Sequence, residues 1–502
     1  MLRILGGNKR LCDGLTRRDW LHVGGLGFLG IGLSDFLRLK DIRGATRPAF
    51  PAGTFGRAKS CILLLPYGSP PQHETFDPKP QAPQEIRGQF KPIPTTVPGL
   101  QICDGLPRIA KIADRITVVR SMTHPYPVHC TAYVTSGIPN YSVALESRPR
   151  DPKLWPYIGS VVDYVLEQRS PNFIPPVPRN MAMPWKMNSR GGSAAAAVQA
   201  GPYAAFLGPA YDPVLTEFEG EGSRKIYKIS PAGGTKYEIF DPYAGVKPDG
   251  RFRLAGAQRR ADMTLDRQNR RQSLLQQFDL ARQELLGTNS KTESFDRYQQ
   301  LALSLMTSAK VHRAIDIHQE PMTRRNEYGM TLFGQSCLAA RRLVEADSRF
   351  ITVFWDEYGY INTDWDTHWN QHYRLSDRLL PGFDMAFSAL ILDLEQRGML
   401  DETLVVWMSE HGRTPKFNKN AGRDHWSRVY SIAMAGGGVG KGNVVGESDR
   451  HGGDVRSNPV SPKDILATIL HLLGINAQTT IPDQLDRPVP VAGTGVVRDD
   501  LF

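Results

Sequence analysis

Two acid–histidine pairs stand close together near the end of the chain. Glu410 and His411 follow the apolar run LVVWM, and Asp424 and His425 come shortly after them. Zinc, manganese and iron(II) accept mixed carboxylate and imidazole ligands, whereas calcium and magnesium prefer oxygen ligands alone. The stretch 404–426 therefore suggests the hypothesis of a transition-metal site.

Similar groups of polar residues follow three other apolar runs, CILLL, ITVVR and FITVFW, which we interpret as strands. Seven of the 12 histidines lie after these four runs, a concentration that scattered surface histidines would not give. The candidates after the first three runs are His73, Glu74 and Asp77; then Ser121, Thr123, His124 and His129; then Asp364, Asp366, His368 and His372.

Each candidate also has a purely structural interpretation. His368 and His372 could share one face of a helical turn, and Asp424 could cap a helix. Glu410 could pair with Arg413 or Arg423. Because the candidates occur together at four strand ends, the metal site is the better interpretation of the set.

The order of elements predicts an α/β fold. Strand-like and helix-like segments alternate at 60–137 and again at 350–475, which is typical of a parallel sheet covered by helices. The segment 150–255 is rich in Pro, Gly and Ala without clear periodicity, and 260–347 has helical spacing of apolar residues. We therefore expect a large irregular and helical insertion at about 150–345.

Composition is that of a globular protein: 502 residues, 40% hydrophobic and 22% charged, with a formal charge of +10. The arginine-rich run 259–271 also carries periodic leucines and acidic residues, and no aromatic-interleaved motif accompanies it. We interpret this run as a solvated helix face, and we expect no nucleic-acid partner.

The N-terminal residues 1–45 resemble a twin-arginine export leader. Thr16-Arg17-Arg18-Asp19-Trp20-Leu21 precedes VGGLGFLGIGLSDFL, which is too short and too glycine-rich for a stable transmembrane span. An ordinary N-terminal helix is the alternative. The leader implies the twin-arginine export machinery as a partner and a periplasmic or cell-envelope location. No A-x-A cleavage site follows, which is consistent with a leader that stays attached. A leader that stays attached would anchor the protein.

Several longer stretches resemble known families. FDMAFSALILDLEQRGMLDETLVVWMSEHG is similar to the segment of sulfatases and other alkaline-phosphatase-like enzymes whose acid and histidine bind metal. Asp364-Trp-Asp-Thr-His368 resembles the D-x-x-x-H metal pair of that superfamily, and His425 its last histidine ligand. The closer match, through TFDPKPQAPQEIRGQFKPI, YGMTLFGQSCLAARRLVEA, GRTPKFNKNAGRDHW and ESDRHGG, is to the exported domain of unknown function 1501 family within the same superfamily.

This resemblance implies an alkaline-phosphatase-like three-layer sandwich with a mostly parallel central sheet over residues 58–502. It implies an exported, metal-dependent hydrolase of phosphate or sulfate esters, acting on a small molecule or a polysaccharide. We expect a divalent metal as the cofactor, zinc or manganese, with calcium as a further candidate. The implied ligands are Asp366, His368, Glu410, His411 and His425, with Glu74, Asp364 and His372 in reserve.

The resemblance is less complete at the residues that would carry out catalysis. HPYPVHCTAYVTSGIPN is similar to the nucleotide-pyrophosphatase version of the motif, but alignment on His129 puts Pro125 in the nucleophile position. We expect attack by a metal-activated water or by Thr123, with Arg413 or Arg423 holding the anionic oxygens of the ester.

The missing nucleophile and a second departure from the superfamily pattern leave an alternative open. The first strand ends in Pro66-Tyr67-Gly68 where the superfamily has an aspartate, and Glu74 is the nearest substitute. A non-catalytic metal-binding or scaffold protein that retains the fold is therefore the second hypothesis.

Cys337-Leu-Ala-Ala-Arg341 fits the sulfatase modification pattern C-x-[PA]-x-R, but it lies in the second half of the chain on an amphipathic segment, so we expect Cys337 at a helix interface.

Overall fold

A computed structural model describes residues 53–502 except 140, 150, 152, 172, 192–200, 230–235, 256–296, 298–307 and 360–363. The predicted leader at 1–45 and the arginine-rich run at 259–271 lie outside the described residues.

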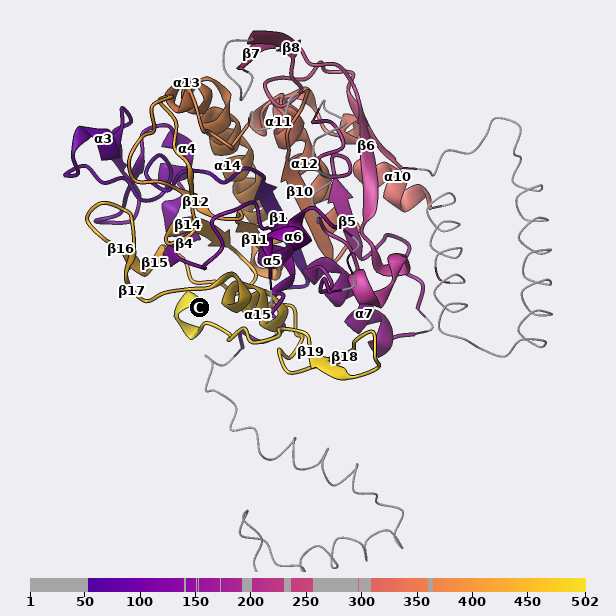
Figure 1. Cartoon of the computed structure of the whole chain (residues 1–502). Helices are drawn as coiled ribbons and strands as arrows, with labels where there is room; N and C mark the ends of the chain where they lie inside the picture. Colours follow the sequence, from indigo (N-terminus) through magenta and orange to yellow (C-terminus); the bar gives the residue numbers. More distant parts are fainter. Residues whose placement is uncertain are drawn as a thin grey trace, which may run out of the picture. The chain divides into compact units, whose positions relative to one another are not determined.

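A nine-stranded sheet forms the centre of the domain (Figure 1). Within it, only β14 and β9 run antiparallel to their neighbours. The predicted α/β fold with a mostly parallel sheet is confirmed. In spatial order the strands are β15 (Asn443–Val445), β4 (Ile116–Met122), β14 (Tyr430–Ala435), β11 (Thr403–Trp407), β1 (Ser60–Pro66), β10 (Phe350–Trp355), β5 (Asn180–Met183), β6 (Val214–Glu219) and β9 (Arg251–Leu254).

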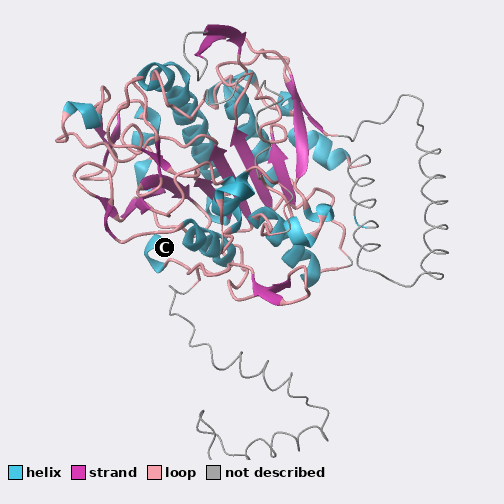
Figure 2. Ribbon diagram, in the orientation of Figure 1, coloured by secondary structure: helices cyan, strands magenta, loops and turns pink. Residues whose placement is uncertain are grey.

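Helices cover both faces of this sheet (Figure 2). Ile62 and Leu64 of β1 pack in one core cluster with α12 (Leu332–Glu345) and α14 (Leu380–Gln396). The alternate residues Cys61 and Leu63 pack in a second cluster with α7 (Ile158–Arg169) and α15 (Pro462–Leu472). A strand buried on both sides needs apolar residues at every position, which explains the continuous run SCILLLP.

Shorter elements complete the fold, and none of them joins the central sheet. Their bounds are α3 (Gln84–Arg87), α4 (Pro107–Ala110), α5 (Thr131–Ser136), α6 (Val143–Glu146), α10 (Ala309–Ile315), α11 (Met322–Glu327), α13 (Gln371–Arg374), β2 (Pro92–Pro94), β3 (Gln101–Cys103), β7 (Lys225–Ile229), β8 (Lys236–Phe240), β12 (Gly412–Arg413), β13 (His425–Trp426), β16 (Glu447–Ser448), β17 (Val455–Ser457), β18 (Thr480–Pro482) and β19 (Pro488–Pro490).

The strand order brings several loops to one edge of the sheet. The neighbours β11, β1 and β10 are parallel, so their carboxyl ends lie side by side. β14 runs the other way, and its first residue, Tyr430, pairs with Met122 at the end of β4. The loop that precedes β14 therefore reaches the same edge as the loops that follow the parallel strands, and this is where ligands bind in open α/β sheets.

The stretch at about 150–345, which we expected to form an insertion, contributes β5, β6 and β9 to the central sheet and α7 and α12 to its faces. Cys337 lies fully buried in α12, and burial raises the pKa of its thiol well above the usual range. This position agrees with a cysteine at a helix interface.

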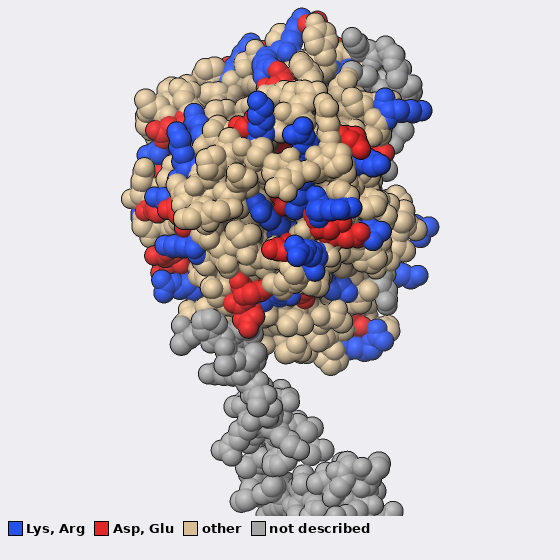
Figure 3. Space-filling model, turned by 90° about the vertical axis from the view of Figure 1, so that its left-hand side faces the viewer, with Lys and Arg blue, Asp and Glu red and all other residues tan. Residues whose placement is uncertain are grey.

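Basic and acidic side chains are interspersed on the face of the domain shown in Figure 3. Among the described residues, no helix is long and apolar enough to cross a membrane.

Candidate metal centre

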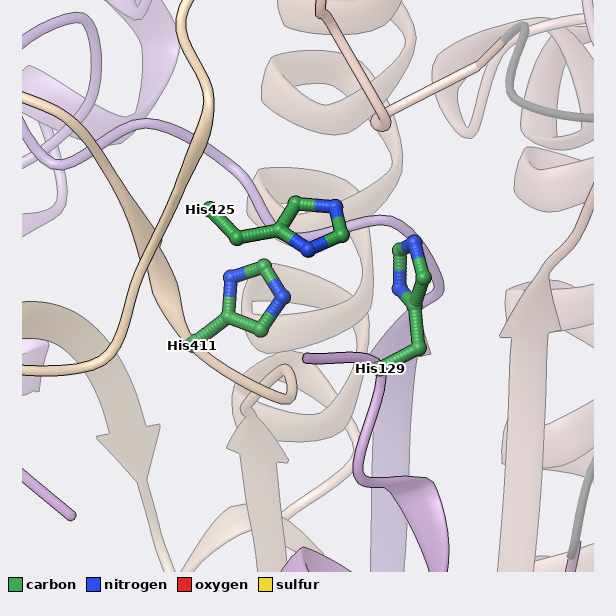
Figure 4. Close-up of side chains that lie close together, drawn as sticks. All are labelled: His129, His411 and His425. Carbon is green, nitrogen blue, oxygen red and sulfur yellow. The ribbon is translucent and has the colours of Figure 1, made fainter. Parts of the chain in front are cut away.

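Three histidines from separate segments point toward one another at the carboxyl edge of the sheet (Figure 4). His129 stands just before α5, His411 follows β11, and His425 belongs to β13. β13 pairs with β12 in a small antiparallel ribbon, with Arg413 opposite His425. This pairing returns the chain to the edge that it left after β11.

The donor atoms form two overlapping groups. One consists of His129, His411 and His425, the other of Asp366, His368 and His425, and in each group the donor atoms lie within 4.8 Å of one another. Nε2 of His425 lies 3.0 Å from Nε2 of His368 and 3.2 Å from Oδ1 of Asp366. His425 thus links the two groups.

Two buried atoms show that this arrangement fits a cation. Within the described part of the chain, Nε2 of His411 and Oδ2 of Asp366 have no hydrogen-bond partner, and Nε2 of His129 lies 3.6 Å from this Oδ2. Nδ1 of His411 donates to the carbonyl of Gly412 (2.8 Å), so the neutral ring presents a lone pair at Nε2. Buried polar atoms without partners are rare, and a mixed imidazole–carboxylate set suits zinc or manganese.

The centre is open to solvent on one side. The side chains of His129, His368 and His425 are 15%, 24% and 21% exposed, whereas Asp366 at the base is 1% exposed. A ligand arriving from solvent can therefore reach the histidines, whereas the carboxylate of Asp366 is buried.

Local charges divide the histidines into two kinds. Burial, helped by the nearby cations, lowers the pKa of His411 well below the usual range, and burial lowers that of His425 to about 4. Both rings are therefore neutral at pH 7, as metal ligation requires. Burial also acts to lower the pKa of His129, but the carboxylates of Asp366 and Glu410 outweigh it and raise this pKa to about 10.

Glu410 lies behind His129 and belongs to neither donor group. Its Oε1 is 3.5 Å from Nδ1 of His129, and its Oε2 accepts hydrogen bonds from the hydroxyls of Ser69 and Ser409. The Glu410 side chain is fully buried, so in this geometry it supports His129.

Arg413 is also fully buried, and all three of its guanidinium nitrogens donate to protein oxygens. Nε donates to the carbonyl of Ser69 (3.0 Å), Nη1 to that of Arg423 (3.1 Å), and Nη2 to the carboxylate of Asp366. Burial raises the pKa of Asp366, but Arg413, followed by His129, outweighs it and holds this pKa well below the usual range. Arg413 therefore orients an ionised Asp366, and its donors do not face an incoming ester.

Arg423, the other arginine expected to meet an ester, is engaged in the same way. Its Nη2 lies 2.6 Å from Oε1 of Glu74, and its Nη1 donates to the carbonyl of Thr414 (3.0 Å). Its guanidinium also stacks on Phe417. Glu74 and Arg423 together fasten the loop between β12 and β13 to the segment that follows β1.

The reserve candidates lie outside both donor groups. Glu74 pairs with Arg423 as above. Asp364 lies 3.5 Å from Nζ of Lys228 and 3.6 Å from Nη2 of Arg378. The ring of His372 packs against Phe90. The structure thus brings together Asp366, His368, His411 and His425 and leaves these three apart from them.

Thr123 lies beside the centre without a polar link to it. Its amide donates to the carbonyl of Val460 (2.9 Å), and within the described chain its hydroxyl makes no hydrogen bond. The next residue, His124, does reach the centre, because its Nε2 hydrogen-bonds the backbone carbonyl of Glu410 (2.6 Å).

Three further residues support the ligands or their neighbours. Asp424 accepts a hydrogen bond from Nδ1 of His368 (2.7 Å) and so orients that ring. Tyr67 stacks on His129 with 4.9 Å between ring centroids, and Ser69 contacts Glu410. The sequence marks Asp424 by its place beside His425, but the roles of a tyrosine and a serine at a strand end are not visible without the fold.

Comparison with known proteins gave one family and a set of solved structures. The family model described as "Protein of unknown function (DUF1501)" matches residues 58–502. No curated protein matches the sequence.

Three solved structures that match are a sulfatase, a synthase and a hydrolase. The PsFucS1 sulfatase from Pseudoalteromonas sp. has a TM-score of 0.38 at 11% identity, covering 94% of this chain and 75% of that one. The lipoteichoic acid synthase LtaP from Listeria monocytogenes has a TM-score of 0.34 at 10% identity, covering 92% and 81%. The phosphonate monoester hydrolase SpPMH from Silicibacter pomeroyi has a TM-score of 0.32 at 11% identity, covering 86% and 77%. Likeness at this level carries no argument about activity here.

Proposed function

The chain belongs to the DUF1501 family, and from the geometry of its candidate centre we propose that it is a metal-dependent hydrolase of phosphate or sulfate esters. One observation carries the proposal: two donor groups, His129–His411–His425 and Asp366–His368–His425, meet at His425, and among the described residues Nε2 of His411 and Oδ2 of Asp366 are buried without a hydrogen-bond partner. The substrate is an ester of a small molecule or a polysaccharide, and the metal is zinc or manganese.

His411, His425, His368 and Asp366 would hold the ion, which when bound supplies electrophilic activation of an ester oxygen. Arg413 keeps Asp366 ionised and aimed at the centre, and Asp424 fixes the ring of His368. Nδ1 and Nε2 of His129 lie 3.5 and 3.6 Å from the carboxylates of Glu410 and Asp366, and the ring is partly exposed. His129 is therefore the group placed to hold a proton and donate it to the leaving oxygen.

A substrate panel tests this proposal. Aryl phosphates, phosphodiesters and aryl sulfates are assayed with zinc, manganese and calcium against the wild-type protein, His411→Ala and His318→Ala. His318 hydrogen-bonds the carbonyl of Gly250 and belongs to neither donor group, so its variant is the matched control. We expect metal-dependent turnover of at least one ester class in the wild type and the control, and its loss in His411→Ala.

A second candidate is a non-catalytic metal-binding or scaffold protein. The engagement of Arg413 and Arg423 with protein oxygens favours it, because the two cations expected to hold the ester are already occupied. Stoichiometric metal together with no turnover of any ester in the panel would decide for this second candidate.

We also propose export through the twin-arginine route, supported by Thr16-Arg17-Arg18-Asp19-Trp20-Leu21. Residues 1–57 fused to a reporter that folds before export should carry it to the periplasm or cell envelope. Replacing Arg17 and Arg18 together by Lys should retain it inside, whereas Arg10→Lys should not. Reporter export that is unaffected by the double replacement would contradict this route.

A further inference from the structure

The turn that follows β1 lies against three segments of the centre, those of His129, Asp366 and His411, although it contributes no metal-binding side chain. The ring of Tyr67 stacks on His129. Gly68 packs so closely on the loop after β10 that a Cβ atom there would come within 2.3 Å of the amide nitrogen of Asp366. Ser69 contacts the loop after β11.

The hydroxyl of Ser409 donates to that of Ser69 (3.5 Å), and Ser69 makes three further contacts with that loop. Its hydroxyl donates to Oε2 of Glu410 (3.2 Å) and accepts from the amide of His411 (3.2 Å). Its carbonyl accepts from Nε of Arg413 (3.0 Å). One residue thus links the carboxylate behind His129, the backbone of a candidate ligand and the arginine that orients Asp366.

The backbone of Ser69 adopts a conformation that serine rarely takes. Its φ angle is +68°, and the residue is fully buried. A left-handed conformation costs an L-residue free energy that glycine does not lose, so a serine persists there when surrounding contacts hold it. The hydroxyl contacts are the reason that we find for a serine at a position whose backbone favours glycine.

We propose that Ser69 is a positioning residue that fixes Glu410 and the backbone of His411, and through them the geometry of the metal centre. This inference rests on the proposed metal site. Ser69 is not placed to act as a nucleophile, because its fully buried side chain cannot meet a substrate. Residues that orient metal ligands typically change metal affinity about 10- to 100-fold when they are removed.

Cobalt(II) binding to the metal-free protein tests the proposal, with calorimetry for affinity and visible absorption for ligand geometry. Ser69→Gly removes the hydroxyl and suits the backbone angle, so it should fold with a thermal midpoint no lower than that of the wild type. We expect its cobalt affinity to fall about 10- to 100-fold, with an altered absorption spectrum. Ser69→Ala should lose affinity equally, with a lower thermal midpoint.

The matched control is Asp486→Gly. Asp486 also has a left-handed backbone (φ +57°) but lies exposed in the turn between β18 and β19. This variant should bind cobalt as the wild type does. An unchanged affinity and spectrum in Ser69→Gly, at any thermal midpoint, overturns the positioning role alone. A wild-type protein that takes up no cobalt overturns the proposed metal site and this inference with it.

Discussion

The loops after β10 and β11 differ from the turn after β1, although the three strands are neighbours in the sheet. The two loops supply Asp366, His368 and His411. The turn supplies a tyrosine ring, backbone groups and one hydroxyl, all of which touch ligands or their supports. The loops after β10 and β11 therefore supply candidate ligands, and the turn after β1 keeps these ligands and their supports in place.

The largest effect that this comparison predicts is on stability, at Arg413. Arg413→Met should lower the free energy of unfolding by about 3–5 kcal/mol, because it removes the nearest cation from the buried carboxylate of Asp366. Chemical denaturation measures this loss. Arg428→Met should cost less than about 1 kcal/mol, since the Arg428 side chain is 62% exposed and its pair with Asp454 is screened by solvent. Full stability of Arg413→Met with a raised KM would instead assign Arg413 to ester binding.

The pairing of His129 with two carboxylates predicts a pH dependence in the metal-free protein. The folded-state pKa of His129, about 10, lies above its ordinary value of 6.5, so the stabilisation is fully present below pH 6.5 and is lost as pH rises toward 10. As the pH rises over this range, the free energy of unfolding should fall by about 1–3 kcal/mol more in the wild type than in His129→Gln. Urea unfolding of both proteins at several pH values between 6 and 10 measures the difference. Parallel curves would show that His129 makes no such pairing.

A smaller effect distinguishes two roles of His129, as a group that holds a proton and as a metal ligand. If His129 keeps its proton beside the bound ion, metal binding at pH 7 should release fewer than about 0.5 protons per chain, because His411 and His425 are already neutral. Calorimetry in buffers of different ionisation enthalpy counts these protons. Release of about one proton would make His129 a metal ligand.

The smallest expected effect is at Thr123. Its hydroxyl makes no hydrogen bond within the described chain, so Thr123→Ala should leave kcat within about twofold on any ester that the panel identifies. A loss of several orders of magnitude, with metal still bound, would identify Thr123 as the nucleophile.

The parts of this molecule that could be predicted share one physical origin. Strands buried on both faces require continuous apolar runs, so β1, β10 and β11 were visible in the sequence, and parallel neighbours place their following loops together. For this reason the convergence of Asp366, His368, His411 and His425 could be expected before the fold was known.

Other features depend on contacts that leave no pattern. β5 has only four residues, Asn180–Met183, and follows a proline-rich stretch, so its place in the sheet was not apparent. A buried arginine that orients a carboxylate and one that awaits a substrate look alike in sequence, which is why Arg413 and Arg423 were expected to bind the ester. The proposed role of Ser69 depends on its hydroxyl contacts and its left-handed backbone, and only the fold reveals these.

Elemental analysis of the purified chain, reconstituted with zinc and manganese and freed of loose ions, determines whether the candidate centre binds a metal. His425 belongs to both donor groups, so His425→Ala is the decisive variant. We predict at least one transition-metal ion per wild-type chain and a small fraction of that in His425→Ala, with both proteins folded. A metal-free wild type, or a variant with wild-type metal content, would contradict the account.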